Sequence, residues 1–167
     1  MEQREWIVAG IDVGAATVKT VILNGDAIQS SAILPSGASV VKAAEAVMQE
    51  ALKRSGLIMD NLGYVVSTGY GRRAVSFAHK ALTEILCHAR GVSSLHPGVR
   101  TVIDIGGQDS KVIAVDEQGR VTNFVMNDKC AAGTGRFLEV MAMILEVKIQ
   151  EIGSLSLHAR EPCKVTS

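Results

Sequence analysis

The feature that most constrains the fold of this chain is a hairpin motif that occurs twice, 92 residues apart. The first copy runs from Ile11 to Val21 and the second from Ile103 to Ile113. In each copy an apolar strand ends in Asp-x-Gly, a tight turn follows, and the return strand carries Lys five residues after the Gly. One copy alone is typical of any hairpin with glycine at its turn. Because both Asp and Lys recur, we predict two related hairpins.

Two such hairpins, facing each other across a cleft, form a clamp for a polyphosphate. Their backbone N–H groups grip the phosphates from both sides, while the carboxylates of Asp12 and Asp104 hold a hydrated magnesium ion. The residues expected to meet the phosphates are Gly14, Lys19, Gly106, Gly107 and Lys111. The chain has no G-x-x-x-x-G-K-[ST] motif, so this clamp would work without a Walker loop.

Two further segments are candidates for nucleotide contact. Gln108 lies at the tip of the second turn, where its amide can position a water against a γ-phosphate, although a plain polar turn residue is the alternative. The glycines beside it favour the phosphate role. Residues 69–74 match the loose G-x-G-x-x-A form of a dinucleotide site, but no acidic residue ends a following strand, which makes that signal weak.

Hydrophobic periodicity predicts an α/β protein with mixed sheets, because strands and helices alternate along the chain. The predicted strands are 6–13, 18–23, 27–34, 64–67, 100–105, 111–116 and 121–125, and the predicted helices are 39–55, 72–89 and 137–147. Gly56 is placed to end the first helix. The stretch 95–98 marks a boundary, so we expect a first lobe at residues 1–97 and part of a second at 98–167.

The polar loop 127–136 directly precedes the last predicted helix and contains Cys130, Gly133 and Gly135. Free N–H groups at the helix start and the positive end of its dipole would favour a phosphate, a thiolate or a reduced metal cluster. A lone cysteine is more often buried and inert. The three cysteines include no Cys-x-x-Cys pair, so a four-thiolate iron–sulfur cluster would need two chains.

Composition argues against several classes of function. The 17 basic and 17 acidic side chains cancel, which leaves no basic surface for nucleic acid or an anionic membrane. The first residues lack the basic start and apolar stretch of a secretory signal. No apolar run approaches the roughly 18 residues of a membrane-spanning helix. We therefore expect a cytoplasmic protein without a nucleic-acid or membrane partner.

Four segments together resemble the activator component of 2-hydroxyacyl-CoA dehydratases, in the BadF/BadG/BcrA/BcrD ATPase family. They are Gly10–Gly14, Thr68–Arg72, Asp104–Lys111 and Asn127–Arg136. The last two are long and specific, whereas the first is shared across the actin, Hsp70 and sugar-kinase superfamily. The family also includes the ATP-binding subunits of benzoyl-CoA reductases, to which the Gly14–Thr17 turn and the Glu151–Ser156 stretch are similar.

The resemblance implies an actin-like (ribonuclease H-like) fold that binds ATP and Mg²⁺, and a homodimer that shares one 4Fe-4S cluster. ATP binding and hydrolysis would change the angle between the cluster-bearing helices and drive one electron into a CoA-ester dehydratase or reductase. A ferredoxin or flavodoxin would be the electron donor. Cys130 matches the first cluster ligand of the family.

This sequence departs from the family in two respects. Ala15 and Ala16 stand where many members carry hydroxyl residues, which leaves Thr17 and backbone N–H groups for the phosphates. Family members are longer, and their second cluster cysteine follows a serine-rich segment that would begin here at Thr166. Cys163 lies several residues too early to match it and is a minor candidate. Two functions from other classes stay open, namely a small-molecule kinase with the same fold and a non-catalytic module acting in subunit contacts.

Overall fold

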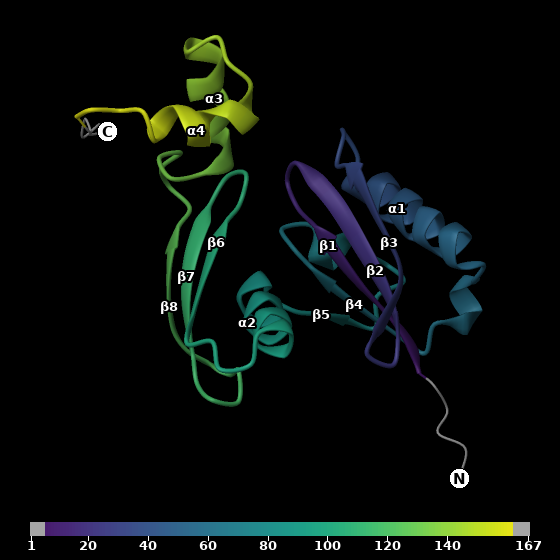
Figure 1. Cartoon of the computed structure of the whole chain (residues 1–167). Helices are drawn as coiled ribbons and strands as arrows, with labels where there is room; N and C mark the ends of the chain where they lie inside the picture. Colours follow the sequence, from purple (N-terminus) through teal and green to yellow (C-terminus); the bar gives the residue numbers. More distant parts are fainter. Residues whose placement is uncertain (1–5, 162–167) are drawn as a thin grey trace. The chain divides into compact units, whose positions relative to one another are not determined.

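The computed structural model describes residues 6–161 and divides the chain into two compact units, residues 1–87 and 88–167. Each unit is built on a β-sheet of its own (Figure 1). In the part of the chain that is described, no helix combines the length and the apolar character needed to cross a membrane.

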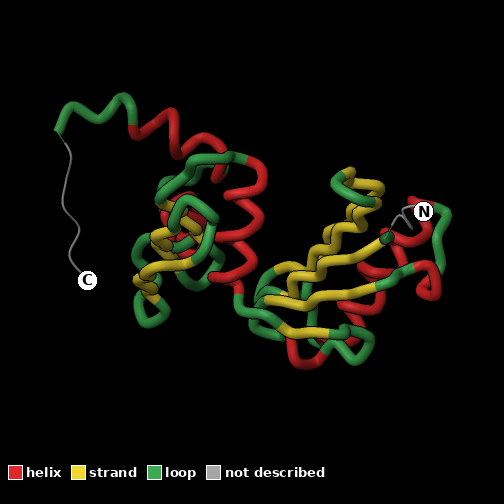
Figure 2. The backbone as a smooth tube through the Cα atoms, turned by 90° about the horizontal axis from the view of Figure 1, so that it is seen from below, coloured by secondary structure: helices red, strands yellow, loops and turns green. Residues whose placement is uncertain are grey.

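The N-terminal unit contains a five-stranded mixed sheet in the order β3-β2-β1-β4-β5, whose strands lie side by side in yellow in Figure 2. The strands are β1 (Ile7–Val13), β2 (Thr17–Asn24), β3 (Ala27–Pro35), β4 (Tyr64–Thr68) and β5 (Lys80–Ala81). The first three form an antiparallel meander, because short turns join them. β4 and β5 run parallel to β1 on its other side, so the sheet is mixed, as predicted.

Helix α1 (Val40–Ser55) packs against β2 and β3 and covers one face of this sheet (Figure 1). The Ser39 side chain accepts a hydrogen bond from the Lys42 N–H, and the helix ends at Gly56 in the left-handed conformation, φ 69°. Its buried residues are Ala44, Val47, Met48, Ala51 and Leu52. Together with Ile11 and Ile22 of the sheet they form the core of the unit. Burying each large aliphatic side chain contributes about 1.5–3 kcal/mol.

The second unit contains a three-stranded antiparallel sheet, β6 (Thr101–Ile105), β7 (Ser110–Val115) and β8 (Val121–Asn127). Helix α2 (Glu84–Leu95) enters the unit at His88, and its Ala89 is fully buried, as is Ile113 of β7. Helices α3 (Gly135–Ile144) and α4 (Ile152–Ser156) follow β8. Residues 6–161 also contain three short 3₁₀ segments: η1 (Met59–Asn61), η2 (Arg72–Ala74) and η3 (Ile149–Glu151).

The predicted helix over residues 72–89 is wrong. That stretch contains η2, the short strand β5 and only the first half of α2. Hydrogen bonds to β4 decide its conformation, since the His79 N–H donates to the Val65 carbonyl at 2.9 Å and the Val65 N–H donates to His79 Nδ1 at 3.0 Å. These contacts join residues distant in sequence, so they override the local helical pattern.

Two boundaries also differ from those predicted. The last predicted helix, 137–147, is observed as α3 at residues 135–144, and the backbone turns at Glu146, whose φ is 54°. The compact units divide inside α2, between Cys87 and His88, rather than in the loop after it. This division follows from packing, because Arg90 and Ser93 in the second half of α2 contact the β7–β8 turn.

Candidate functional site

The first Asp-x-Gly hairpin is formed by the ends of β1 and β2 in the N-terminal unit. Asp12 and Lys19 are directly opposite each other in the β1–β2 register, and their Oδ2 and Nζ atoms lie 3.0 Å apart. The Gly14 N–H donates to the Thr17 carbonyl at 3.1 Å and closes the turn. A Cβ atom on Gly14 would lie 2.9 Å from that carbonyl oxygen, so the turn requires glycine.

Asp12 has a second carboxylate oxygen, Oδ1, that is buried and has no hydrogen-bond partner among the residues described. Its neighbour in the β1–β4 register is Thr68, whose buried Oγ1 also lacks a partner there. Lys19 beside them is 42% exposed. A buried polar atom without a partner is costly, and a hydrated Mg²⁺ with its phosphates would satisfy both oxygens. The residues of this hairpin therefore fit a magnesium–nucleotide group.

Gly69 and Gly71 pack against the end of β1 and place β4 beside Asp12. Gly69 has φ +91°, and a Cβ atom there would lie 2.6 Å from Asp12 Oδ1. The Gly71 N–H donates to the Val13 carbonyl at 2.9 Å. The sequence analysis considered these glycines only as part of a weak dinucleotide motif and gave Thr68 no role at the site. Only the short 3₁₀ segment η2 begins here, not an α-helix, so the dinucleotide alternative lacks its structural context.

The second hairpin repeats the first in the second unit. Asp104 is opposite Lys111 in the β6–β7 register, with Oδ2 and Nζ 3.2 Å apart. The Gly106 N–H donates to the Asp109 carbonyl at 2.9 Å, as Gly14 does to Thr17. Gln108 is exposed at the tip of this turn. The prediction of two related hairpins is confirmed, and their registers correspond.

The charges of the two hairpins differ. Asp109 stands where the first hairpin has Thr17, and its Oδ1 lies 2.6 Å from Lys111 Nζ. His88 of α2 adds a contact of 3.2 Å between its Nδ1 and Asp104 Oδ2. Lys111 is therefore buried between two carboxylates, with 3% of its side chain exposed. Lys19, in contrast, is accessible to a ligand.

Helix α3 begins directly on the second turn. The Gly135 N–H donates to the Gly106 carbonyl at 2.8 Å, and the Arg136 N–H donates to the Gly107 carbonyl at 3.0 Å. The fully buried Thr134 caps the helix by accepting from the Phe137 N–H. The sequence predicted free N–H groups at the start of this helix. The N–H groups of Gly135, Arg136 and Phe137, however, already have partners.

Cys130 lies in the loop between β8 and α3 and is a partly buried free thiol. Asn127 holds this loop, since its Nδ2 donates to the Cys130 carbonyl at 3.0 Å and its Oδ1 accepts from the Cys130 N–H at 3.3 Å. In residues 6–161, no three side chains of the ligating types His, Cys, Asp and Glu gather as a metal site. Gly133 has φ +78° in the same loop. The other ligand candidate, Cys163, lies outside the described residues.

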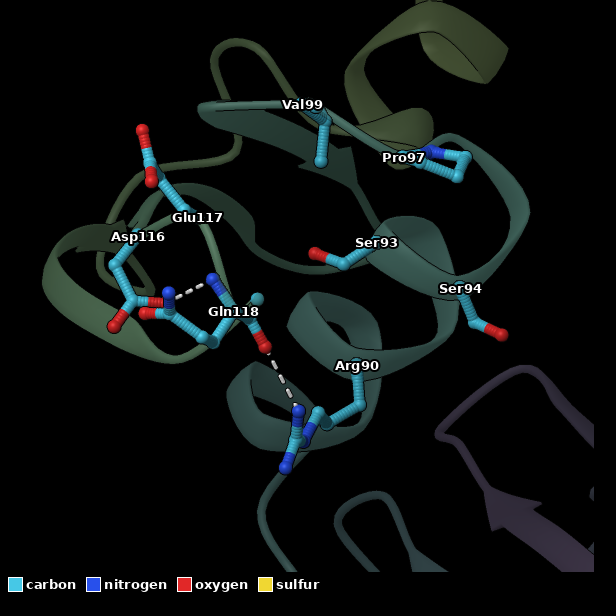
Figure 3. A pocket seen from close by; sticks show the side chains of 10 residues that line it. Arg90, Ser93, Ser94, Pro97, Val99, Asp116, Glu117 and Gln118 are labelled. Carbon is cyan, nitrogen blue, oxygen red and sulfur yellow. Dashed lines mark hydrogen bonds between the residues drawn. The ribbon is translucent and has the colours of Figure 1, made fainter.

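A separate cavity of about 480 Å³ lies between the end of α2 and the β7–β8 turn (Figure 3). Asp116 Oδ1 accepts from the N–H groups of Arg120 and Gln118 at 2.8 and 2.9 Å. The hydrogen bond from Arg120 is the main reason that the pKa of Asp116 is lowered from its usual 3.8. None of the predicted site residues lines this cavity, so it is distinct from the hairpins.

The structure therefore brings the predicted residues together in two groups. Asp12, Gly14, Thr17 and Lys19 meet in the first hairpin. Asp104, Gly106, Gly107 and Lys111 meet in the second, with Gly135 packed against it. Because the hairpins belong to different units, their facing each other across one cleft stays a prediction.

Comparison with known proteins identifies relatives of this chain. The model of the BadF/BadG/BcrA/BcrD ATPase family matches residues 9–167. The 2-hydroxyisocaproyl-CoA dehydratase activator of Clostridioides difficile is 46% identical over 159 residues, covering 95% of this chain and 59% of that protein. A benzoyl-CoA reductase subunit of Thauera aromatica is 35% identical over 166 residues, covering 96% of this chain and 58% of that protein.

Two solved structures of activators are similar to this one. Component A of (R)-2-hydroxyglutaryl-CoA dehydratase from Acidaminococcus fermentans superposes with a TM-score of 0.88 at 41% identity, covering 97% of this chain and 62% of that one. The activator of the 2-hydroxyisocaproyl-CoA dehydratase from Clostridium difficile, with bound ADPNP, gives 0.85 at 45% identity, covering 96% and 60%. The chain thus spans about three fifths of the length of these relatives.

More distant structures share the fold alone. The ethanolamine utilization protein EutJ of Carboxydothermus hydrogenoformans has a TM-score of 0.58 at 17% identity, and the ROK hexokinase of Thermus thermophilus has 0.57 at 13%. The predicted α/β, actin-like ATPase fold with a mixed sheet is confirmed. Since the family model covers nearly all of the sequence, the chain belongs to the BadF/BadG/BcrA/BcrD ATPase family.

Proposed function

We propose that this chain carries the nucleotide-binding hairpins of a cytoplasmic ATPase that activates a 2-hydroxyacyl-CoA dehydratase by delivering single electrons to it. The activator relatives support the dehydratase as partner. The similarity to a benzoyl-CoA reductase subunit supports a reductase as the alternative partner. In this proposal a homodimer shares a 4Fe-4S cluster, and a ferredoxin or flavodoxin reduces it.

The first hairpin would hold the metal and phosphates of Mg–ATP. Asp12 offers a carboxylate oxygen that has no hydrogen-bond partner within residues 6–161, and Lys19 is exposed enough to neutralise phosphate charge. Gly14 and Thr17 would present the turn to the phosphates. A relative of this chain was solved with the ATP analogue ADPNP bound, which supports a nucleotide at this fold's hairpins.

The second hairpin would complete the clamp. Asp104 would contribute to the magnesium shell, and the turn at Gly106 and Gly107 would face the phosphates. Exposed Gln108 would orient the attacking water. Buried Lys111 would not contact the phosphates. Its charge compensates the carboxylates of Asp104 and Asp109 and would hold them in place.

The proposed coupling between ATP hydrolysis and the Cys130 loop rests on one observation. The N–H groups of Gly135 and Arg136 donate hydrogen bonds to the carbonyls of Gly106 and Gly107. They attach the start of α3 to the turn that would contact phosphate. A change at the turn on nucleotide hydrolysis would therefore move α3 and the Cys130 loop before it. Gly133 and Gly135 would help to link the turn to the Cys130 loop, in addition to any contact they make with the ligand.

Cys130 would supply one thiolate to the 4Fe-4S cluster. The cluster supplies one-electron redox chemistry when it is bound. The donor set of residues 6–161 does not complete four thiolates, since Cys87 and Cys130 are the cysteines described. A second chain would contribute the equivalent Cys130, and each chain would contribute one further thiolate. Asn127 would orient the loop that presents this thiol.

Nucleotide binding tests the first part of the proposal. Titration of the chain with Mg–ADPNP in a calorimeter should show binding that Asp12→Asn weakens about tenfold or more, which corresponds to about 1.4 kcal/mol. Asp26→Asn is the matched control, because Asp26 is an exposed turn residue of the same unit. Equal affinity of the two variants would remove Asp12 from the site.

Cluster reconstitution tests the second part. Under anaerobic conditions the protein should gain an iron–sulfur absorption band that Cys130→Ala abolishes and Cys87→Ala preserves. A band that survives Cys130→Ala would reject the ligand assignment. Transfer of the γ-phosphoryl group to an added small-molecule acceptor, in place of hydrolysis, would favour a kinase instead.

A further inference from the structure

Ser36, the residue directly after β3, lies against the turn of the first hairpin and is 3% exposed. Its hydroxyl donates to the Gly14 carbonyl at 2.7 Å, and its backbone N–H donates to the Ala16 carbonyl at 3.0 Å. Two carbonyls of the turn therefore point toward one buried residue. Neither hydrogen bond lies within the β1–β2 hairpin, so Ser36 holds the turn from outside.

These two hydrogen bonds determine where the N–H groups of the turn point. In a trans peptide unit the C=O and N–H bonds point in opposite directions, and the described chain has no cis peptide bond. With the Gly14 carbonyl fixed toward Ser36, the Ala15 N–H points away from Ser36. With the Ala16 carbonyl fixed in the same way, the Thr17 N–H also points away. Both N–H groups are thus directed away from the buried side of the turn.

The turn lies beside the ion pair of Asp12 and Lys19. A Cβ atom on Gly14 would lie 3.4 Å from Lys19 Nζ and 4.0 Å from Asp12 Oδ2. Ala15 and Ala16 are exposed and carry no polar side chain. Within residues 6–161, the Ala15 N–H has no acceptor. Backbone N–H groups that point outward from a turn form an anion-binding concavity, and here an accessible ammonium group lies next to it.

The turn of the second hairpin is held at the equivalent position. Gly106 corresponds to Gly14, and its carbonyl accepts from the Gly135 N–H at 2.8 Å. The donor there comes from the start of α3, whereas in the first hairpin it comes from Ser36. Because two unrelated segments provide the same contact, the contact indicates a requirement of the turn itself.

We propose that Ser36 is a positioning residue for phosphate binding by the first hairpin. Its hydroxyl and N–H hold the turn in the conformation that presents the Ala15 and Thr17 N–H groups to a phosphate beside Lys19. Ser36 does not contact the phosphate, since it lies on the buried side of the turn. Donors that are fixed before the ligand arrives need no ordering on binding, which favours affinity. The inference rests on the proposed function, because it concerns the same nucleotide site.

Removal of the serine hydroxyl tests this role. Ser36→Ala deletes the donor to the Gly14 carbonyl and keeps the N–H bond to Ala16. We expect the affinity for Mg–ADPNP in calorimetry to fall about threefold to tenfold, the range of one intramolecular hydrogen bond. Mg–tripolyphosphate, which lacks the nucleoside, should show the same loss. In ¹H–¹⁵N NMR spectra the Ala15 and Thr17 signals should shift when Mg–ADPNP binds, and less so in Ser36→Ala.

Ser30→Ala is the matched control. Ser30 lies in β3, and its hydroxyl donates to the Ala51 carbonyl of α1 at 2.8 Å. The substitution therefore removes a similar hydrogen bond from the same unit, away from the turn. It should leave the affinity for both ligands and the NMR shifts of the turn as they are in wild type.

Unchanged affinity in Ser36→Ala, or equal losses in the two serine variants, would overturn the proposal. So would Ala15 and Thr17 signals that stay in place while Mg–ADPNP binds. Asp12→Asn separates these results from a failure of the proposed function. Binding that depends on Asp12 but not on Ser36 would remove only the positioning role, whereas a wild-type chain that does not bind Mg–ADPNP would overturn both.

Discussion

Replacing the two equivalent lysines by methionine should separate their roles. Lys111 is 3% exposed, and its ammonium group lies 3.2 Å from Asp104 and 2.6 Å from Asp109. Lys111→Met keeps a side chain of similar length but leaves two adjacent carboxylates without their cation. Removing one partner from a buried ion pair costs about 3–5 kcal/mol, so we expect a loss of that size in the second unit.

Lys19→Met is the matched substitution in the first hairpin. The Lys19 and Asp12 side chains are 42% and 28% exposed, so solvent screens their interaction. Pairs of this kind contribute about 0–1 kcal/mol, and the stability of the N-terminal unit should change by no more than that. The affinity for Mg–ADPNP should fall instead, because Lys19 is the lysine that a phosphate can reach.

Urea-dependent hydrogen exchange with mass spectrometry provides the measurement, because peptides from β2 and β7 report the two units separately. Stability losses that agree to within about 1 kcal/mol for the two variants would refute the reasoning. So would a loss of nucleotide affinity for Lys111→Met in a chain whose second unit keeps its full stability. The second result would mean that Lys111 meets the ligand directly.

Two other substitutions test individual contacts. Gly69→Ala forces a side chain into φ +91° with its Cβ against the Val13 carbonyl oxygen, so it should destabilise the N-terminal unit by more than about 1 kcal/mol and weaken Mg–ADPNP binding. The control Gly10→Ala has open space around it, and its free energy of unfolding should stay within about 0.5 kcal/mol of wild type in urea denaturation. Asp116 has a lowered pKa, so its ionised form stabilises the fold fully above pH 3.8 and less as the pH falls through the lower native value. Asp116→Asn should therefore be less stable than wild type above pH 3.8, and the difference should shrink below it in acid titrations followed by circular dichroism.

The parts of the fold that local chemistry determines could be predicted from the sequence. Strand alternation and short turns predict both hairpins, and Ser39 and Gly56 mark the two ends of α1. The segment before α2 could not be predicted, because hydrogen bonds between His79 and Val65 decide its course. Hydrogen bonds between residues 14 positions apart leave no trace in the local pattern of apolar and polar residues.

The candidate site could be predicted in its residue types but not in its charges. The sequence treats Lys19 and Lys111 alike, since both follow their Asp by seven residues. Burial distinguishes them, and burial depends on Asp109 in the turn and on His88 from α2. The contact between the start of α3 and Gly106 could not be predicted from the sequence either, because it joins backbone atoms and involves no particular side chain.

The asymmetry between the hairpins is consistent with the positions of the elements attached to them. The first turn accepts hydrogen bonds from Ser36, directly after β3, at the Gly14 and Ala16 carbonyls, and its Lys19 stays accessible to a ligand. The second turn also holds the start of α3, and through it the Cys130 loop. In the proposed function this turn would transmit a displacement to α3, and the ion pairs of Lys111 with Asp104 and Asp109 would keep the turn rigid as it moves. In the proposed function both turns would therefore contact phosphate, and the second would also transmit its movement to the Cys130 loop.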